Sequence, residues 1–358
     1  MNTLYRILSL KDSEEWNKYL NMLPYAQQDI YFSPQYYFLY ESYGDGEAIC
    51  FVYQQGNKIA LYPFLKNSIN KLGYRLDTEY FDIQGAYGYN GVITNCEETE
   101  FKDGFYQAFN AFCQKENIVA EFTRSHPLLQ NHKFSKEYMT VLYNRKTVFL
   151  NLQQTEEEIW EKSYSSSNRN KIRKALKNNV EIIVSKQQDD YLSFYNIYVE
   201  TMQDVNSDRY LFFNQQYFID FLKQMPNNHK LILAKLNGEI IGGMILMFYN
   251  NYAHYHLSAR KKEYGKYATN NLFLDYAIKE SKTQGCKFFH FGGGTTSDEK
   301  DSLLKFKSNF SKDKSSFYIG KKVHNKEVYS AIIKQWKEKF TKSYSKNNQV
   351  ILGYRILE

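Results

Sequence analysis

The feature that most constrains the fold is an order of secondary structure that occurs twice along the chain. Residues 49–66 contain two β-rich runs on either side of a glycine-containing turn at residues 55–57. Residues 231–248 show the same arrangement around Asn237 and Gly238, and Asn-Gly between two such runs is a strong signal for a β-hairpin. The sequence therefore predicts two equivalent hairpins.

Each hairpin is followed by an amphipathic helix and then by another strand. Residues 105–117 and 271–285 carry apolar side chains at helical spacing, and the strand-like runs 118–124 and 286–294 come directly after them. Further helices are predicted ahead of the hairpins, at residues 34–43, 190–203 and 215–223. A repeated order of this kind predicts an α/β fold with a mixed sheet in each half.

A chain of 358 residues exceeds the size at which a single hydrophobic core keeps growing, so two domains are expected. We place the first domain at residues 1–150 and the second at 151–322, because a strand ending near Leu150 is followed by the acidic helix start TEEEIW. Residues 323–358 should complete the fold. They are predicted to hold one amphipathic helix, a polar connector at 341–349 and a final strand at 349–357.

Composition excludes several classes of protein. The four cysteines are scattered without a CxxC pair, which argues against a zinc site and against a disulfide scaffold. The first residues show no signal peptide, and the apolar run 240–248 is too short to cross a bilayer. We therefore expect a cytoplasmic protein without a metal, a cofactor or a transmembrane segment, for which peripheral contact with a membrane stays open.

A basic helix is the first candidate for a binding site. Between Lys162 and Val180 there are six basic residues and no acid, and Arg169 and Arg173 lie four residues apart on one helical face. Such a helix offers bidentate donors to phosphate. A solvated helix face without a ligand is the alternative.

A glycine-rich strand end is the second candidate. Three glycines, including Gly292 and Gly293, end the strand at 286–294 and would let a ligand approach the backbone closely. A short helix follows, in which Lys305 or Lys307 is expected to point outward. A lysine there would neutralise a phosphate or a developing oxyanion, although a plain surface lysine is the alternative.

Two further segments bear on catalysis. His256 shares one strand face with His254 and is a candidate general base, although a satisfied structural histidine is the alternative. Turns that bind coenzyme A carry a second small residue at a fixed position. Residues 260–271 have Tyr267 at that position, so the coenzyme A signature is degenerate.

The segments WEKSYSSSNRNKIRKALKNNVEI and HFGGGTTSDEKDSLLKFKSNFS resemble the Fem-type peptidyltransferases and related GNAT acyltransferases, with support from FSPQYYFLY, IQGAYGYNG and YHLSA followed by ATNNLFLDYAI. The resemblance implies two tandem GNAT-like domains, each a mixed, mostly antiparallel sheet flanked by helices. It implies an acceptor cleft in or near the first domain and a donor channel in the second. It also implies that Arg169 binds acceptor phosphates, that Lys307 meets the donor and that Tyr210 is a cleft tyrosine.

Three functions follow as hypotheses. In the first, the chain is an aminoacyltransferase that moves an amino acid from charged tRNA to an amine of a peptidoglycan or other envelope glycan precursor, linked to a nucleotide or a lipid. In the second, it is an acyl-CoA-dependent N-acyltransferase that acts on an amino sugar or an amino acid. In the third, it keeps the fold as a binding protein without catalysis.

Overall fold

The computed structural model describes residues 4–205 and 207–357, and it divides into two compact units. Unit 1 comprises Met1–Asn144 and Phe317–Glu358, and unit 2 comprises Arg145–Ser316. The chain thus passes from one unit to the other twice, within β7 (Thr140–Asn151) and within β13 (Lys314–Val323). The limits expected from the sequence, 150/151 and 322/323, fall later along the same two strands.

The sheet of unit 1 runs from the edge strand β1 to β13. The pairing is antiparallel between all neighbours except β4 and β6, which run parallel. The strands, in spatial order, are β1 (Leu4–Ser9), β2 (Glu47–Gln55), β3 (Lys58–Ser68), β4 (Phe81–Gln84), β6 (Ile118–Arg124) and β13, with the short β5 (Ile93–Thr94) paired to β3.

The sheet of unit 2 has the same strand order and the same directions. Its only parallel pair among the described strands is β11 with β12, which corresponds to β4 with β6. The strands, in spatial order, are β8 (Glu181–Ser185), β9 (His229–Leu236), β10 (Glu239–Tyr249), β11 (Tyr252–Arg260), β12 (Phe288–Gly293) and β7. The internal repeat read from the sequence is confirmed.

The last strand of each sheet is exchanged between the two halves of the chain. After β6, the chain does not return to unit 1 but supplies β7, which pairs with β12 from Phe288 onward in unit 2. After β12, it supplies β13, which pairs with β6 between Ile319 and Val323. Each sheet is therefore completed by a strand from the end of the other repeat. β7 follows the first repeat and completes the sheet of unit 2, whereas β13 follows the second repeat and completes the sheet of unit 1.

The two predicted hairpins form at the predicted turns. Gly56 adopts a φ of 62° between β2 and β3, while Asn237 and Gly238 adopt φ values of 52° and 83° between β9 and β10. Consecutive left-handed residues match the twist of the flanking strands, and Asn and Gly tolerate this conformation best.

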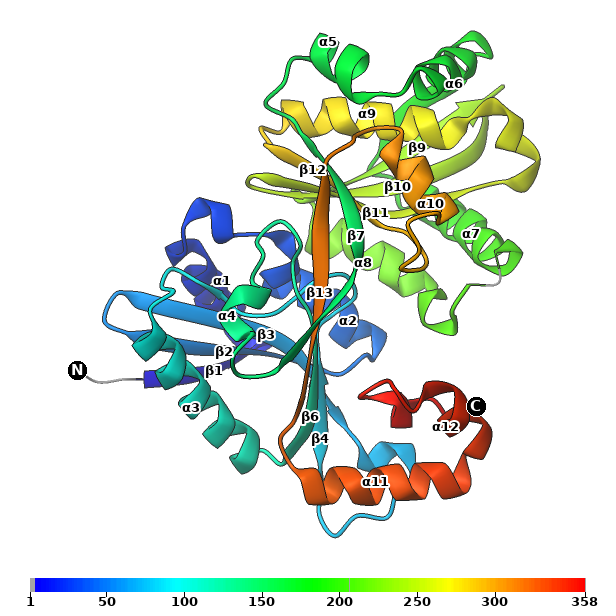
Figure 1. Ribbon diagram of the computed structural model, residues 1–358. Helices are drawn as coiled ribbons and strands as arrows, with labels where there is room; N and C mark the ends of the chain where they lie inside the picture. The colour runs from blue at the N-terminus through cyan, green and yellow to red at the C-terminus, as the bar shows by residue number, and fades with distance from the viewer. Residues whose placement is uncertain (1–3, 206, 358) are drawn as a thin grey trace. The chain divides into compact units, whose positions relative to one another are not determined.

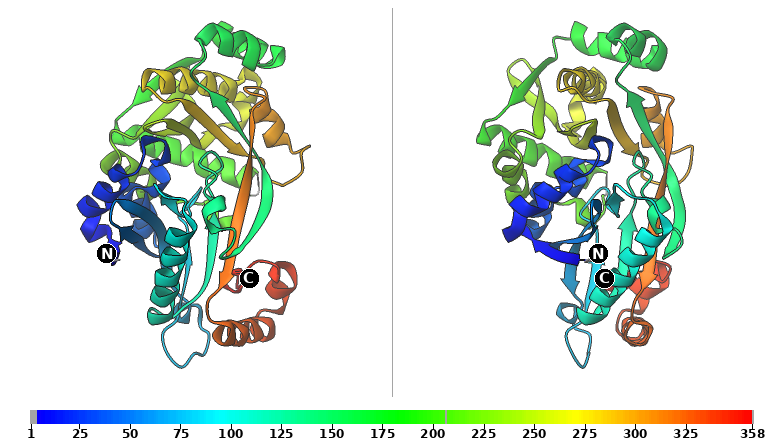
Figure 2. Two further views of the ribbon diagram at one scale, coloured as in Figure 1. Left: turned by 60° about the vertical axis from the view of Figure 1, so that its left-hand side comes forward. Right: turned by 90° about the vertical axis from the view of Figure 1, so that its left-hand side faces the viewer.

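The helices of unit 1 cover both faces of its sheet. On one face, Phe105, Phe109 and Phe112 of α3 pack with Ile49 and Phe51 of β2 in one core cluster. On the other face, the hydroxyl of Tyr37 in α2 donates to the carbonyl of Pro63 in β3 at 2.8 Å. The helices are α1 (Ser13–Met22), α2 (Pro34–Tyr43), α3 (Thr99–Lys115), α4 (His132–Ser135), α11 (Lys326–Lys339) and α12 (Thr341–Asn347), and Figure 2 shows α11 and α12 in red at the end of the chain.

The C-terminal segment differs from the prediction in two places. The expected polar connector forms α12, and the expected final strand is instead a turn with a short 3-10 helix, Gly353–Arg355. Tertiary contacts explain the second difference, because the Tyr354 hydroxyl donates to the buried carboxylate of Asp82 at 2.7 Å and Arg355 pairs with the same carboxylate. These contacts fix a conformation that a strand would not allow.

The helices of unit 2 also lie on both sides of its sheet. In Figure 1, α9 lies on one side of β9 to β11, and α7 and α8 lie on the other. One large core cluster joins Met244 and Leu246 of β10 to Phe273 and Ala277 of α9. The helices are α5 (Glu156–Glu158), the π-helix Ile159–Ser163, α6 (Ser166–Lys177), α7 (Gln188–Asp204), α8 (Gln215–Gln224), α9 (Thr269–Thr283) and α10 (Ser302–Ser308), together with the 3-10 helices Arg209–Leu211 and Lys262–Tyr267. None of the helices in the described part of the chain has the length and apolar character needed to span a membrane.

Candidate active site

A short stretch of pairing joins the two parallel strands of unit 2. β11 pairs with β12 only from Tyr252 to His254, although β11 continues to Arg260 and β12 continues to Gly293. The unpaired ends of both strands contact one side chain. The Nζ atom of Lys307 donates to the carbonyl oxygen of Gly293 at 2.7 Å and lies 5.6 Å from the ring centre of Tyr255.

Of the two candidate lysines on α10, Lys305 points outward and the buried one is Lys307. Its relative exposure is 7%, whereas Lys305, two residues before it in α10, is exposed. Burial lowers the pKa of Lys307 to about 7, an effect that the Asp301 carboxylate opposes and Arg145 strengthens. At neutral pH the amine is therefore present in both protonation states, which is typical of a functional lysine.

The loop between β12 and α10 is fixed by one carboxylate. Asp301 caps α10 by accepting from the backbone of Leu303 and Leu304, and it also accepts from the backbone and hydroxyl groups of Thr295 and Thr296. Burial alone would raise the pKa of Asp301, but these hydrogen bonds outweigh it and hold the pKa well below its usual range. The loop therefore holds a permanent negative charge near Lys307.

The glycines at the end of β12 are required by their surroundings. Gly292 has a φ of 79°, which a side chain rarely tolerates. A Cβ on Gly293 would lie 2.9 Å from Cδ of Arg145, and a Cβ on Gly294 would lie 2.4 Å from Oδ1 of Asp301. The backbone approaches the loop and Arg145 closely here, while contact of Gly292 and Gly293 with a substrate stays a prediction.

Comparison with known proteins decides the class of this unit. Residues 162–307 match the family model of the acetyltransferase (GNAT) domain. Unit 2 is a GNAT acyltransferase domain. No curated protein matches the chain in sequence.

Solved structures extend the similarity to both units. FemX matches with 14% identity and a TM-score of 0.70, over 92% of this chain and 99% of its own. L-PGS from Bacillus licheniformis matches with 14% identity and a TM-score of 0.56, over 90% and 95%. A tandem GNAT protein from the clavulanic acid biosynthesis pathway matches with 9% identity and a TM-score of 0.51, over 89% and 98%. The chain has the tandem GNAT fold, as the resemblance implied.

The basic helix of the GNAT domain uses its first arginine internally. Arg169 donates from one nitrogen to the carbonyls of Trp160, Glu161 and Tyr164, at 2.8 to 3.2 Å. It thereby ties α6 to the π-helix and to the residue after it. Arg173 is exposed and lies 5.3 Å from the ring of Trp160. Binding of phosphate by either arginine stays a prediction, and the structure gives Arg169 a stabilising contact that the sequence did not indicate.

His256 and Tyr210 both lie in the GNAT domain beside other aromatic side chains. His256 lies 2.9 Å from the hydroxyl of Tyr217, and burial, aided by His254 and His229, lowers the pKa of His256 to about 3. A base with so low a pKa holds a proton poorly at neutral pH. Tyr210 lies in the 3-10 helix Arg209–Leu211, where its ring packs edge-on against Phe213. Their participation in the reaction stays a prediction.

The segment that would hold coenzyme A in the GNAT domain is a 3-10 helix, Lys262–Tyr267. Its backbone amides are engaged locally, because Tyr264 donates to Lys261 and Ala268 donates to Gly265. The Arg260 guanidinium lies against Gly265, where a Cβ would be only 2.7 Å from it. Tyr267 packs against the domain core.

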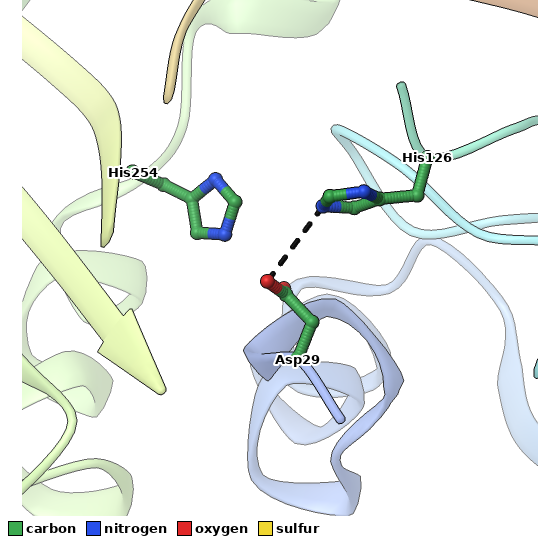
Figure 3. A group of neighbouring side chains, drawn as sticks. All are labelled: Asp29, His126 and His254. Carbon is green, nitrogen blue, oxygen red and sulfur yellow. Dashed lines mark ion pairs between the residues drawn. The ribbon is translucent and has the colours of Figure 1, made fainter. Parts of the chain in front are cut away.

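Unit 1 contains a buried pair that sequence reasoning missed. The carboxylate of Asp29 lies 3.6 Å from Nε2 of His126, and both side chains are fully buried (Figure 3). The backbone N–H of Leu129 donates to Nδ1 of His126, which places the ring proton of a neutral His126 on the nitrogen that faces Asp29. The two residues lie far apart in sequence, and the only local signal was a histidine directly after a predicted strand.

Proposed function

We propose that the chain transfers an aminoacyl group from charged tRNA to an amine of an envelope glycan precursor that is linked to a nucleotide or a lipid, and that it does so in the cytoplasm. The observation that carries the proposal is the buried Lys307 amine, held by Gly293 where β11 and β12 are no longer paired. The fold shared with FemX and the resemblance of the segments around Arg169 and Lys307 support it.

The reaction proposed is the aminolysis of an ester. The acceptor amine attacks the carbonyl carbon of the aminoacyl ester, and the carbon–nitrogen bond forms as the carbonyl oxygen becomes an oxyanion. The carbonyl then re-forms as the carbon–oxygen bond to the ribose breaks, and the departing ribose oxygen takes the proton that the amine loses and becomes a hydroxyl. An ammonium has three N–H donors, and Lys307 uses one on Gly293. A second would stabilise the oxyanion, which is the kind of interaction that contributes most to acyl transfer.

The turn after β11 supports tRNA over coenzyme A as the donor. A pyrophosphate needs backbone N–H groups that are not already hydrogen-bonded. In this turn, the amides of Tyr264 and Ala268 have partners within the turn, and Arg260 occupies the space beside Gly265. A terminal adenosine without a pyrophosphate makes no such demand on this turn.

The deciding experiment compares two donors. Purified protein is incubated with a nucleotide-linked or lipid-linked amine acceptor and either a pool of tRNA charged with labelled amino acids or labelled acetyl-CoA. We expect transfer from charged tRNA alone. Transfer from acetyl-CoA with none from tRNA would establish the alternative, an acyl-CoA-dependent N-acyltransferase.

This second function is favoured by one observation, which is that the family model matching residues 162–307 is described as an acetyltransferase domain. It has a simple independent test. A ligand that binds only the folded state raises the melting temperature, so coenzyme A should stabilise the protein if it is the donor. If neither donor supports transfer and variants of Lys307 behave as wild type in cells, the chain acts as a binding protein.

A further inference from the structure

A cluster of three different metal-ligating side chains, two buried and one half-buried, lies in unit 1, whereas Lys307 belongs to unit 2. Cys113 comes from α3, Glu121 comes from β6 and His324 follows β13 directly. One ligand atom of each lies within 4.8 Å of the other two. The sequence predicted no metal site, because its four cysteines are scattered without a CxxC pair.

The three positions are fixed by the core around them. Cys113 belongs to the cluster in which α3 packs against the sheet, and its relative exposure is 0%. Glu121 is 1% exposed on a central strand, and it pairs in register with Lys322 of β13. The backbone N–H of His324 donates to the carbonyl of Val119, which fixes the histidine beside the same strand. Little ordering would be needed to bring three such groups onto an ion.

The carboxylate of Glu121 is oriented by a second residue. Its Oε1 atom lies 3.5 Å from the hydroxyl of Tyr62, a long hydrogen bond, while its Oε2 atom lies 2.5 Å from Nε2 of His324. The Tyr62 hydroxyl also lies 3.0 Å from Oγ1 of Thr123. Partners of this kind, which orient a ligand without touching the metal, are a regular part of metal sites.

We propose that Cys113, Glu121 and His324 bind one Zn²⁺ ion. A thiolate, a carboxylate and an imidazole are all ligands that Zn²⁺ accepts, and water would fill the fourth tetrahedral position. The charges balance, because one thiolate and one carboxylate neutralise the dication and the imidazole binds in its neutral form. Binding releases the thiol proton of Cys113 to solvent. The bound ion would join the start of the C-terminal segment to α3 and β6.

The simpler reading of the same contacts is an ion pair between Glu121 and a protonated His324, with Cys113 as an ordinary core residue. The two readings differ on the thiol. The ion pair does not involve Cys113, whereas a metal site loses a ligand when the sulfur of Cys113 is replaced. Whether metal binding depends on Cys113 therefore decides between the metal site and the ion pair.

The probe is Co²⁺, which replaces Zn²⁺ and reports thiolate ligation by a charge-transfer absorption band. The full-length protein is titrated with Co²⁺ and then with Zn²⁺. We expect one Co²⁺ per chain, a thiolate band that Zn²⁺ removes, and a melting temperature that Zn²⁺ raises. Cys113→Ser should lose the band and the Zn²⁺-dependent stabilisation. Cys96→Ser, which changes another buried cysteine of the same core cluster, should keep both.

Glu121→Gln separates the proposal from a loss of folding. This variant removes the ion pair as well as the carboxylate ligand, so its melting temperature without metal reports the pair alone, and its response to Zn²⁺ reports the site. Circular dichroism confirms that each variant is folded. Absence of Co²⁺ binding to folded wild-type protein, or an equal band in Cys113→Ser, would overturn the proposal in favour of the ion pair.

Discussion

The Nζ atom of Lys307 lies 2.7 Å from the carbonyl oxygen of Gly293, so an amine on α10 is held by the last residue of β12. The neighbouring Lys305 has the same chemistry but is exposed to solvent. The two lysines lie on the same short helix, and only one of them is buried. Substituting each lysine in turn therefore tests whether the reaction of the GNAT domain depends on the buried amine or on any lysine of α10.

Lys307→Ala should slow aminoacyl transfer far more than Lys305→Ala. Loss of one donor to an oxyanion typically costs about 100- to 1,000-fold in kcat, whereas loss of an exposed lysine removes no such contact. Initial rates of transfer from charged tRNA, measured for both variants under identical conditions, give the comparison. Equal rates for the two variants would remove Lys307 from the mechanism.

The rate should depend on pH through the charge of Lys307. Burial lowers its pKa to about 7, so the ammonium form is lost as the pH rises through that value, and kcat should fall in the same range. The Asp301 carboxylate raises the pKa of Lys307, so Asp301→Asn should move the fall in kcat to lower pH. If Asp301→Asn acted only by disturbing the structure, it would lower kcat without moving the pH at which kcat falls to half. A rate that instead rises through neutral pH would make the neutral amine a general base.

Lys307→Met should increase stability while abolishing activity. Because the pKa falls from its usual 10.5 to about 7 in the fold, the unfolded chain binds more protons between these two values, and stability rises with pH across that window. At neutral pH the buried charge opposes folding, and methionine removes it. We expect a gain of about 1 kcal/mol at pH 7 by urea denaturation, diminishing towards pH 10.5. The control, Lys305→Met, should change stability by less than about 0.5 kcal/mol. A clear loss of stability in Lys307→Met would mean that the amine is a structural group.

Arg169→Ala should destabilise the GNAT domain, contrary to what a helix exposed to solvent suggests. Its guanidinium donates to the carbonyls of Trp160, Glu161 and Tyr164, and hydrogen bonds from a charged donor are worth more than neutral ones. We expect a loss of about 1–2 kcal/mol, against less than about 0.5 kcal/mol for the exposed Arg173→Ala. Thermal or urea denaturation measures both. If Arg169→Ala keeps full stability but weakens binding with a steep salt dependence, the arginine binds phosphate instead.

Local sequence signals predicted the elements that local interactions determine. The helix expected at residues 34–43 forms as Pro34–Tyr43, where Ser33 caps the first turn and Gly44 ends the helix in a left-handed conformation. The turn at Asn237 and Gly238 formed where the dipeptide required it. In both places, the residues that set the backbone are adjacent in the chain, and a pattern of a few residues contains the necessary information.

Features that depend on distant contacts were not predicted. The residues around Tyr354 have the pattern of a strand, but a contact with Asp82, which is distant in the sequence, holds them in a 3-10 helix. The sequence left open which of Lys305 and Lys307 points outward, and the burial of Lys307 depends on its contacts with Gly293 and Tyr255. The pairing of Asp29 with His126 has the same origin, since no spacing motif connects them. The resemblance to a family singled out Lys307, while the physical reason for its importance needed the three-dimensional structure.

The exchange of β7 and β13 has a consequence for synthesis on the ribosome. When residues 1–144 have emerged, one edge of β6 in the first repeat has no neighbour, because β13 follows the whole second repeat in the sequence. The second repeat already has β7 and can close its sheet earlier. An open edge of this kind pairs readily with strands of other molecules. The nascent protein therefore carries an aggregation-prone edge on its first repeat until the whole second repeat and β13 have been translated.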